Sequence, residues 1–242
     1  MEQVTDKVAV ITGGNSGIGY AAAKVLSQHG AQVIITGRRK AAIEKAASEL
    51  NVTGLLADQA NLSDIDNLVA EIKKRYGKVD ILLINAGITR FALIESTTEQ
   101  VFDEVMDVNF KGAYFMLSKL IPVLNDHASV VFLSSTSATI SPQSASVYAA
   151  SKAAINAVMK IASLELAPRK IRVNAVSPGP VATEMMEKIG LNPELEQQLM
   201  DSIPLSRLGE VSEVAELILF LSGNKAGFIT GSNFLIDGGQ SV

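Results

Sequence analysis

Short apolar runs rich in β-branched residues alternate along the chain with longer stretches in which apolar residues recur at helical spacing. Such an alternation is typical of βαβ units around a parallel sheet. The short runs predict strands at residues 7–11, 32–36, 53–57, 80–84, 129–134, 170–175 and 233–236. The longer stretches predict helices at residues 17–29, 39–50, 62–76, 98–124, 146–167 and 210–222. Most of the strands are apolar almost throughout, which indicates a sheet with helices on both faces.

The length and continuity of this pattern favour one domain. The chain has 242 residues, 48% of them hydrophobic, and no Gly/Ser/Pro-rich linker, repeat or low-complexity tract interrupts the series. We therefore expect a single domain over residues 1–242, with a doubly wound, mainly parallel seven-stranded sheet of the Rossmann type. Residues 178–208 depart from the alternation, because Pro178-Gly179-Pro180 opens a long stretch with only a short helix or two. A long insertion after the carboxyl end of a strand predicts a lid that covers a substrate.

Composition excludes several classes of function. The formal net charge is −4 and the 21 Lys and Arg are scattered, which argues against a nucleic-acid or anionic-membrane surface. There is no cysteine and there are only two histidines, so we expect no metal site, no disulfide and no thiol nucleophile. Residues 1–7 lack the pattern of a signal peptide, and no apolar stretch has the length of a membrane span. These features predict a cytoplasmic protein.

A glycine-rich segment follows the first predicted strand and reads Thr-Gly-Gly-Asn-Ser-Gly-Ile-Gly. Its glycines permit a tight turn and a close approach of the backbone to a pyrophosphate, and the helix that follows directs free N–H groups at the phosphates. A strand-to-helix turn with spare glycines is the alternative, but the position between first strand and first helix favours a dinucleotide site. The candidate cofactor contacts here are Thr12, Gly13, Asn15, Ser16, Gly17, Ile18 and Gly19.

The end of the second predicted strand bears on which dinucleotide is bound. An acidic residue at this point usually holds the adenosine ribose of NAD. Here Arg38 and Arg39 stand instead, and a guanidinium pairs well with the 2′-phosphate of NADP(H). We therefore predict NADP(H), with Arg38 as the main contact and Arg39 either a second contact or a solvated charge. Asp58 and Gln59, at the end of the third strand, are candidates for the adenosine end, although Asp58 is equally suited to cap a turn.

Tyr148 and Lys152 are four residues apart in a predicted helix and so share one face. A phenol has a pKa of about 10, and proton transfer at neutral pH needs that value lowered. A neighbouring ammonium together with a positively charged nicotinamide ring would lower it. Ser135 ends the fifth predicted strand, where a hydroxyl can orient a substrate oxygen. Alone, the Tyr and Lys would equally be a surface pair.

The order of these motifs along the chain favours a catalytic pair over a surface pair. The glycine-rich segment at 12–19 is followed by Asn85-Ala86-Gly87, Asn109, Ser135 and Tyr148-x-x-x-Lys152, and then by Pro178-Gly179 and Asp237-Gly238-Gly239. In this order the chain resembles the short-chain dehydrogenase/reductase family over essentially its whole length.

The resemblance implies a catalytic set of four residues. Tyr148 would be the general acid in reduction and the base in oxidation, and Lys152 would lower its pKa and bind the nicotinamide ribose. Ser135 would hold the carbonyl oxygen. Asn109 would keep a water that links Lys152 to solvent, and capping a local break in its helix is compatible with that role.

The resemblance also implies further cofactor contacts. Asn85, Ala86 and Gly87 look like the segment that supports the central sheet and passes the adenosine ribose. Pro178, Gly179, Val181 and Thr183 match the segment that holds the nicotinamide carboxamide and pyrophosphate. Asp237-Gly238-Gly239 is interpreted as structural.

Three functions remain open at this point. We favour a hydride transfer between NADP(H) and a small ketone or secondary alcohol. A 3-oxoacyl-(acyl carrier protein) reductase is the nearest rival, because residues 85–90 resemble that group, but Asn125-Asp126-His127 lacks the basic residues that would meet an acidic carrier. An NADP(H)-binding redox sensor without chemistry is the third, and it would have no chemical use for the Ser, Tyr and Lys.

The substrate pocket and the oligomeric state are less well marked. The candidate pocket residues are Ile88, Arg90, Thr136, Ser137, Ala138, Gln143, Pro180, Met185 and Met186. The predicted helices 98–124 and 146–167 are apolar on more than one side, which suggests either deep burial or subunit contacts. Because family members are commonly tetramers, we expect a homotetramer whose only other partner is a small-molecule substrate.

Overall fold

The computed structural model describes residues 4–140, 142–183 and 193–242. In that part of the chain seven strands, all parallel, form one sheet in the order β3-β2-β1-β4-β5-β6-β7. The strands are β1 (Val8–Thr12), β2 (Gln32–Gly37), β3 (Thr53–Leu56), β4 (Val79–Ile84), β5 (Leu124–Leu133), β6 (Arg172–Pro178) and β7 (Asn233–Ile236). The predicted doubly wound Rossmann sheet is confirmed, and it is parallel throughout.

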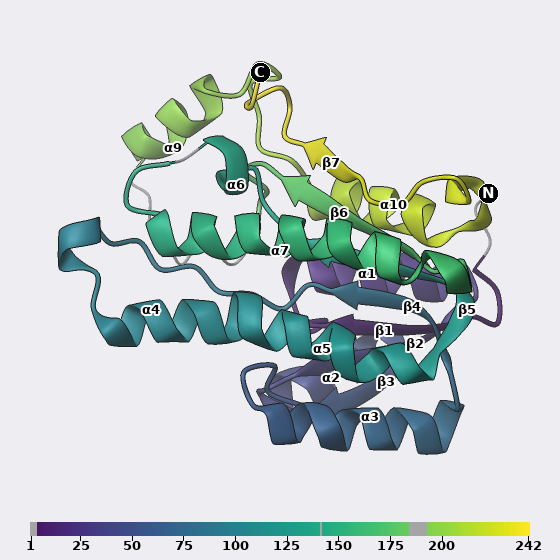
Figure 1. Ribbon diagram of the computed structural model, residues 1–242. Helices are drawn as coiled ribbons and strands as arrows, with labels where there is room; N and C mark the ends of the chain where they lie inside the picture. The colour runs from purple at the N-terminus through teal and green to yellow at the C-terminus, as the bar shows by residue number, and fades with distance from the viewer. Residues whose placement is uncertain (1–3, 141, 184–192) are drawn as a thin grey trace.

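Helices cover both faces of the sheet (Figure 1). The α-helices are α1 (Gly17–Gln28), α2 (Lys40–Leu50), α3 (Leu62–Tyr76), α4 (Glu99–Met106), α5 (Ala113–Leu120), α6 (Ser137–Ile140), α7 (Ser146–Glu165), α9 (Pro193–Asp201) and α10 (Val211–Ser222). A π-helical segment, η2 (Asp107–Gly112), joins α4 to α5. Short 3-10 turns are η1 (Ile94–Ser96), η3 (Ile121–Val123), η4 (Ala167–Arg169) and η5 (Asn224–Ala226).

Two hydrophobic cores lie on the two faces of the sheet. Alternate strand residues such as Val10 and Leu82 pack against α3, α5 and α7, whereas their neighbours Ile11 and Leu83 pack against α1, α2 and α10. Successive side chains of a strand point to opposite faces, so strands that are apolar throughout supply both cores. The apolar runs of the sequence therefore account for the layered arrangement.

The predicted continuous helix at 98–124 was wrong in detail. The segment is α-helical to Met106, π-helical over η2, and α-helical again over α5 before it turns through η3. Pro122 lies in η3 and ends the helix, since proline offers no N–H to the preceding turn. The following strand, β5, consequently begins at Leu124 and not at residue 129, with a shift of register against β4 after Val79.

The parallel registers place all carboxyl ends of the strands at one edge. Thr12 is paired with Thr36, Ile84 with Phe132, and Leu133 with Val176. The strand order reverses between β1 and β4, and ligands of open parallel sheets bind outside the carboxyl ends at such a switch point. The candidate motifs that follow a strand therefore all lie at this edge of the sheet.

Candidate active site

The glycine-rich loop connects the end of β1 to the start of α1 in four residues. Gly13 has a φ of +67°, and its N–H and that of Gly14 donate to Thr36 O at 2.8 and 3.2 Å. A Cβ on Gly19 would lie 2.4 Å from Gly13 O, closer than any side chain permits. The loop can therefore pack against the first turn of α1 only because Gly13 and Gly19 have no side chain.

The end of β4 supports this loop from behind. The Thr12 hydroxyl accepts from the N–H of Asn85 at 3.0 Å and of Ala86 at 2.9 Å. In return the Asn85 amide donates to Thr12 O at 2.9 Å and Gly13 O at 3.1 Å. Thr12 is buried. Its side chain therefore supports the loop from inside the protein, and the contact that we predicted between Thr12 and the cofactor stays a prediction.

The first turn of α1 offers N–H groups to an anion. Ser16, the residue before the helix, has an extended backbone and makes no side-chain cap, and the first turn has no acidic residue. The uncapped N–H groups and the positive end of the helix dipole favour a phosphate. The Thr183 methyl group lies 3.6 Å from where a Cβ on Gly17 would stand, which brings the predicted nicotinamide segment over this turn.

Two further candidates are Asn15, in the loop, and Ile18, in the first turn of α1. Asn15 Oδ1 is 2.9 Å from where a Cβ on Gly37 would stand, so this side chain lies against the end of β2. Ile18 is half-buried and packs on the core beneath α1. Gly37 leads directly into the two arginines.

Arg38 and Arg39 are both exposed. Arg38 lines a cavity of about 750 Å³ together with Ala60 and Val108, and α4 forms its opposite side. Arg39 is the extended residue before α2 and makes no side-chain cap. Of the two, Arg38 is thus the one that faces a space large enough for a ligand.

Asp58 and Gln59 are largely used by the protein itself. Asp58 Oδ1 accepts from Ala60 N at 3.0 Å, which is the turn-capping role. The Gln59 amide donates to Ala86 O at 3.1 Å and Val108 O at 2.9 Å, and its Oε1 is buried with no partner among the described residues. The Gln59 amide thus joins the segment after β4 to η2, and the predicted contact of Gln59 with the cofactor stays a prediction.

Tyr148, Lys152 and Ser135 are brought together between α7 and the end of β5. Ser135 lies close enough to Tyr148 for its hydroxyl to lower the pKa of the phenol, and Ser135 Oγ accepts from Ser137 N at 3.1 Å. Lys152 is buried and donates from Nζ to Leu133 O at 2.7 Å. Its Nζ lies 5.8 Å from the centroid of the Tyr148 ring. Two hydroxyls and one ammonium thus form one polar wall at the sheet edge.

Burial governs the pKa values of this wall. It raises the pKa of the Tyr148 hydroxyl, and the hydrogen bond with Ser135 lowers it by a smaller amount. It lowers the pKa of Lys152 to about 8. In the chain without a cofactor, loss of water around the phenolate therefore dominates the pKa of Tyr148. The predicted lowering, which also requires the positive charge of the nicotinamide ring, stays a prediction.

Asn109 lies buried in the π-helical segment η2. Its Oδ1 accepts from Ile88 N and its Nδ2 donates to Ile88 O, both at 2.8 Å, and Nδ2 also contacts Ser151 Oγ at 3.2 Å. The local break in the helix that we considered for this residue is present as the π turn, a feature frequent at functional sites. A Cβ on Gly87 would lie 3.3 Å from Asn109 Oδ1 and 3.4 Å from Lys152 Nζ, so both polar groups face this glycine.

The segment from Pro178 to Thr183 is held by its backbone. Pro178 O accepts from Thr136 N at 3.0 Å, and Gly179 N donates to Ile236 O at 3.0 Å. Val181 is buried and forms an isolated parallel bridge with Gly209. In the same region the Asp237 carboxylate accepts from Gly239 N and Ser241 N, both at 3.0 Å, as expected of a structural turn.

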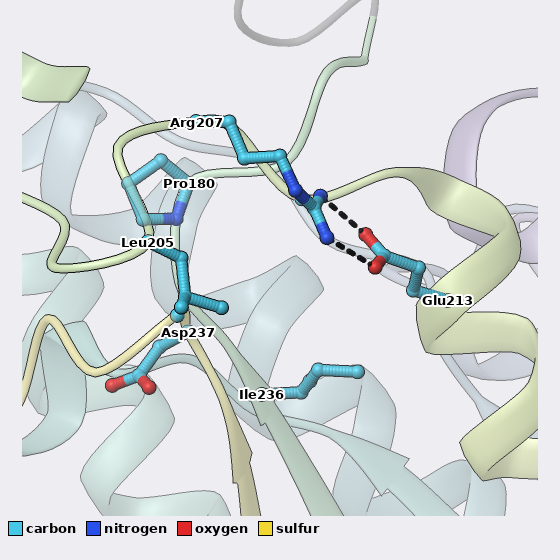
Figure 2. A pocket seen from close by; sticks show the side chains of 8 residues that line it. Pro180, Leu205, Arg207, Glu213, Ile236 and Asp237 are labelled. Carbon is cyan, nitrogen blue, oxygen red and sulfur yellow. Dashed lines mark hydrogen bonds and ion pairs between the residues drawn. The ribbon is translucent and has the colours of Figure 1, made fainter.

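The predicted substrate-pocket residues are dispersed. Ile88 and Arg90 line the cavity beside Arg38, and the Arg90 guanidinium is paired with Glu104 at 3.4 Å. Thr136 is turned toward Pro178, Ser137 and Ala138 lie in α6, and Gln143 is exposed. Pro180 lines a separate cavity of about 100 Å³ (Figure 2). Met185 and Met186 lie outside the described residues.

Sequence reasoning missed Ser151, which connects the wall to η2. Its hydroxyl donates to Tyr148 O at 2.7 Å and contacts the Asn109 amide. The available signal was its place between Tyr148 and Lys152, one helical turn after the tyrosine. The ion pair of Arg207 and Glu213 was not predicted from the sequence either.

The described residues show neither a membrane-spanning helix nor a cluster of metal ligands. Within residues 4–140, 142–183 and 193–242, no helix is long and apolar enough to cross a bilayer. The same residues contain no group of three or more His, Cys, Asp or Glu side chains suited to a metal ion.

Comparison with known proteins adds three findings. A family model described as enoyl-(acyl carrier protein) reductase matches residues 13–241. An NAD-dependent glycerol dehydrogenase of Listeria innocua is 36% identical over 99% of this chain and 95% of its own length, and a 3-oxoacyl-(acyl carrier protein) reductase of Staphylococcus aureus is 35% identical over 97% and 98%. A mutant short-chain dehydrogenase/reductase of Serratia marcescens superposes with a TM-score of 0.94 at 32% identity, over 99% of both chains.

Proposed function

The chain belongs to the short-chain dehydrogenase/reductase family, as an oxidoreductase that acts on alcohol or carbonyl groups, and we propose that it uses NADP(H) and a ketone or secondary alcohol. The observation that carries the proposal is the polar wall of Ser135, Tyr148 and Lys152 at the carboxyl edge of the sheet. A hydroxyl that can give up a proton stands there beside a buried ammonium. That arrangement suits proton transfer to a substrate oxygen.

The residues at this edge fit a nicotinamide dinucleotide. The glycine-rich loop leaves a cradle that a Cβ would fill, and the uncapped start of α1 suits a pyrophosphate. When bound, the nicotinamide donates or accepts the hydride. Of the predicted contacts, the backbone of the loop, Arg38, Gly87, Tyr148, Lys152 and the segment Pro178–Thr183 would hold it.

In the direction of reduction, Tyr148 donates its hydroxyl proton to the carbonyl oxygen. The raised pKa of Tyr148 keeps that proton in place at neutral pH until the oxygen becomes basic. The Ser135 hydroxyl holds the same oxygen, and the Lys152 ammonium stabilises the phenolate left on Tyr148. A lowering of the Tyr148 pKa in the working enzyme then depends on the positive charge of the oxidised nicotinamide in addition to Lys152.

We assign the preference for NADP(H) to Arg38. Its guanidinium is exposed, faces the large cavity and follows a strand end without a carboxylate. These features suit a 2′-phosphate. The relative from Listeria innocua is named NAD-dependent, so the cofactor preference is the point on which the proposal departs from that relative.

A reductase of acyl groups on a carrier protein is the second candidate function, and the relative from Staphylococcus aureus favours it. Against it, the exposed surface before the central part of β5 presents Asp126, whose carboxylate is paired with Arg169 at 2.9 Å. An acidic carrier would meet little free positive charge there. We therefore retain a low-molecular-weight ketone or alcohol as the substrate, and we set aside the sensor without chemistry.

Several wider features remain proposals. We propose one domain over residues 1–242, with 178–208 as the substrate lid, in a cytoplasmic enzyme. Large apolar side chains are exposed on α4, α5 and α7 and near β7, which supports a homotetramer. They are Phe102, Tyr114, Ile161, Leu164, Phe228 and Leu235.

The test is the change in nicotinamide absorbance across a panel of ketones, sugars, acyl thioesters and alcohols, with NADP(H) and NAD(H) in parallel. We expect turnover of a carbonyl compound with NADPH. Turnover restricted to carrier-bound acyl groups would replace the substrate class. Tight cofactor binding without turnover of any compound would contradict the assignment of Tyr148 and favour the sensor.

A further inference from the structure

Arg207 and Glu213 form a bidentate ion pair between the segment that follows α9 and the first turn of α10 (Figure 2). Arg207 Nη1 donates to Glu213 Oε2 at 2.9 Å, and Nη2 donates to Oε1 at 2.6 Å. Two parallel bonds fix the plane of the guanidinium relative to that of the carboxylate. The ion pair thereby ties the orientation of this segment to α10, one of the helices that cover the sheet.

Both members of the pair also bind the backbone around Gly209. Arg207 Nη1 donates to Leu208 O at 3.0 Å, and Glu213 Oε2 accepts from Glu210 N at 2.8 Å. The pair therefore holds the residues on either side of Gly209. Gly209 N in turn donates to Pro180 O at 3.0 Å, and Gly209 O accepts from Ala182 N at 2.9 Å.

This short ladder leads to the cofactor segment. Beyond Val181, the Thr183 methyl group lies over Gly17 at the start of α1, where we place the pyrophosphate. Behind the ladder is a cavity of about 100 Å³, whose walls include Pro180, Leu205 and Ile236 (Figure 2). Close packing is thus incomplete on this side. Pro178 and Gly179 are held by Thr136 and Ile236, whereas the two hydrogen bonds to Gly209 hold the segment farther along, at Pro180 and Ala182.

An exposed ion pair of this kind has little influence on overall stability. The side chains of Arg207 and Glu213 are 53% and 41% exposed, and exposed ion pairs contribute little to the stability of a fold. The hydrogen bonds from Arg207 also lower the pKa of Glu213 to about 2, so the pair stays charged at the pH of any assay. The geometry of the ion pair therefore says more about where it holds the segment than about the stability of the fold.

We propose that the Arg207–Glu213 pair is a positioning clamp for the nicotinamide end of the cofactor. It holds Gly209 against Val181, and so sets where residues 180–183 lie above the first turn of α1. The inference rests on the proposed function, in which Pro178–Thr183 holds that end of the cofactor. The clamp acts through this segment and leaves the adenosine end, at Arg38, unaffected.

The test compares the whole cofactor with a fragment that lacks nicotinamide. Dissociation constants of NADPH and of 2′,5′-ADP are measured for the wild type, Arg207→Gln and Glu213→Gln, with the melting temperature of each. Glutamine at 213 keeps an oxygen for the Glu210 N–H. We expect the constant for NADPH to rise about three- to fivefold, the constant for 2′,5′-ADP to stay within about twofold, and the double variant to resemble the single ones.

Two comparisons make the result specific. Arg75→Gln removes the exposed ion pair with Glu71 on α3, away from the site, and should change neither constant. Arg207→Lys keeps the charge but loses the bidentate contact, and should give an intermediate constant for NADPH. If the wild type prefers NADH, AMP serves as the fragment.

Three outcomes would decide against the clamp. Unchanged NADPH binding in both Gln variants would overturn it, as would parallel weakening of NADPH and 2′,5′-ADP with a lower melting temperature, which indicates a general structural role. If the wild type binds no nicotinamide cofactor at all, the proposed function itself fails, and the clamp fails with it.

Discussion

The glycine-rich loop and the wall of Ser135, Tyr148 and Lys152 lie at the same edge of the sheet but are built differently. The loop presents bare backbone, and the neutral groups behind it, the Thr12 hydroxyl and the Asn85 amide, are paired at 2.9 to 3.1 Å. The wall presents titratable side chains whose charged forms are disfavoured by burial.

The difference shows how binding and proton transfer place different demands on one fold. A cradle for phosphates is made from satisfied neutral hydrogen bonds, so it is compatible with a stable core. A site for proton transfer needs groups whose pKa values are moved by their surroundings, and the burial of a charged Lys152 is destabilising at neutral pH. Substitutions in the two regions should therefore separate binding, chemistry and stability.

The largest effect should follow from removing the Tyr148 hydroxyl, which supplies the proton in the proposed reaction. Tyr148→Phe keeps the ring but loses the hydroxyl, and we expect turnover to fall roughly a hundred- to ten-thousand-fold. Cofactor affinity should change little, because the loop is untouched. Steady-state rates and cofactor titration on the same preparation measure both. Near-normal turnover would remove Tyr148 from the mechanism.

Replacing the buried ammonium tests whether the wall is destabilising. Burial lowers the pKa of Lys152 from 10.5 to about 8, and at pH 7 this corresponds to about 3 kcal/mol. Lys152→Met also loses the hydrogen bond to Leu133 O, at a cost of about 1 to 3 kcal/mol, so we expect a net gain in the free energy of unfolding of at most about 2 kcal/mol at pH 7.

The pH dependence of that gain has a definite sign. Between about 8 and 10.5 the unfolded chain keeps a proton on Lys152 that the folded chain has lost, so the wild type gains stability as the pH rises. The advantage of the variant should therefore shrink across this window. Denaturant unfolding at several pH values measures it, and a constant gap would contradict the lowered pKa.

A methyl group in the cradle should damage binding. Gly19→Ala places a Cβ 2.4 Å from Gly13 O, which belongs to the backbone and cannot move aside without shifting the loop. We expect a loss of about 1 to 3 kcal/mol of stability and weaker cofactor binding, measured below the melting temperature. Gly227→Ala is the control, since its φ is −58° and its Cβ meets one carbonyl oxygen at 3.0 Å. Equal behaviour of the two variants would mean that the loop can relax.

The smallest effect concerns the rim of the cofactor site. Arg38→Ala removes an exposed guanidinium, and we expect NADPH affinity to fall about ten- to a hundred-fold, with NADH affinity unchanged. Arg39→Ala should have a weaker effect, because Arg39 does not line the large cavity. An unchanged preference in Arg38→Ala would mean that the dinucleotide is selected elsewhere.

Much of the fold and part of the site follow from local patterns. The alternation of apolar runs predicts the strands and helices, and the four-residue spacing of Tyr148 and Lys152 predicts their common face on α7. The sequence suggested a local break in the helix at Asn109 but not that the break is a π turn, because η2 covers only Asp107–Gly112. The contacts of the Gln59 amide could not be predicted either, because Ala86 and Val108 are 27 and 49 residues away.

By itself the sequence determined the element order, the two buried faces of the strands, the bare loop after β1 and the presence of the Ser, Tyr and Lys. These properties depend on neighbours within one or two turns of the chain. The tertiary structure alone decided the strand order, the support of the loop by Asn85, the direction of the Tyr148 pKa and the pairing of Arg207 with Glu213. Hydrogen-bond partners and burial are set by which segments meet in space, and a one-dimensional pattern carries no distance between segments that are far apart in the chain.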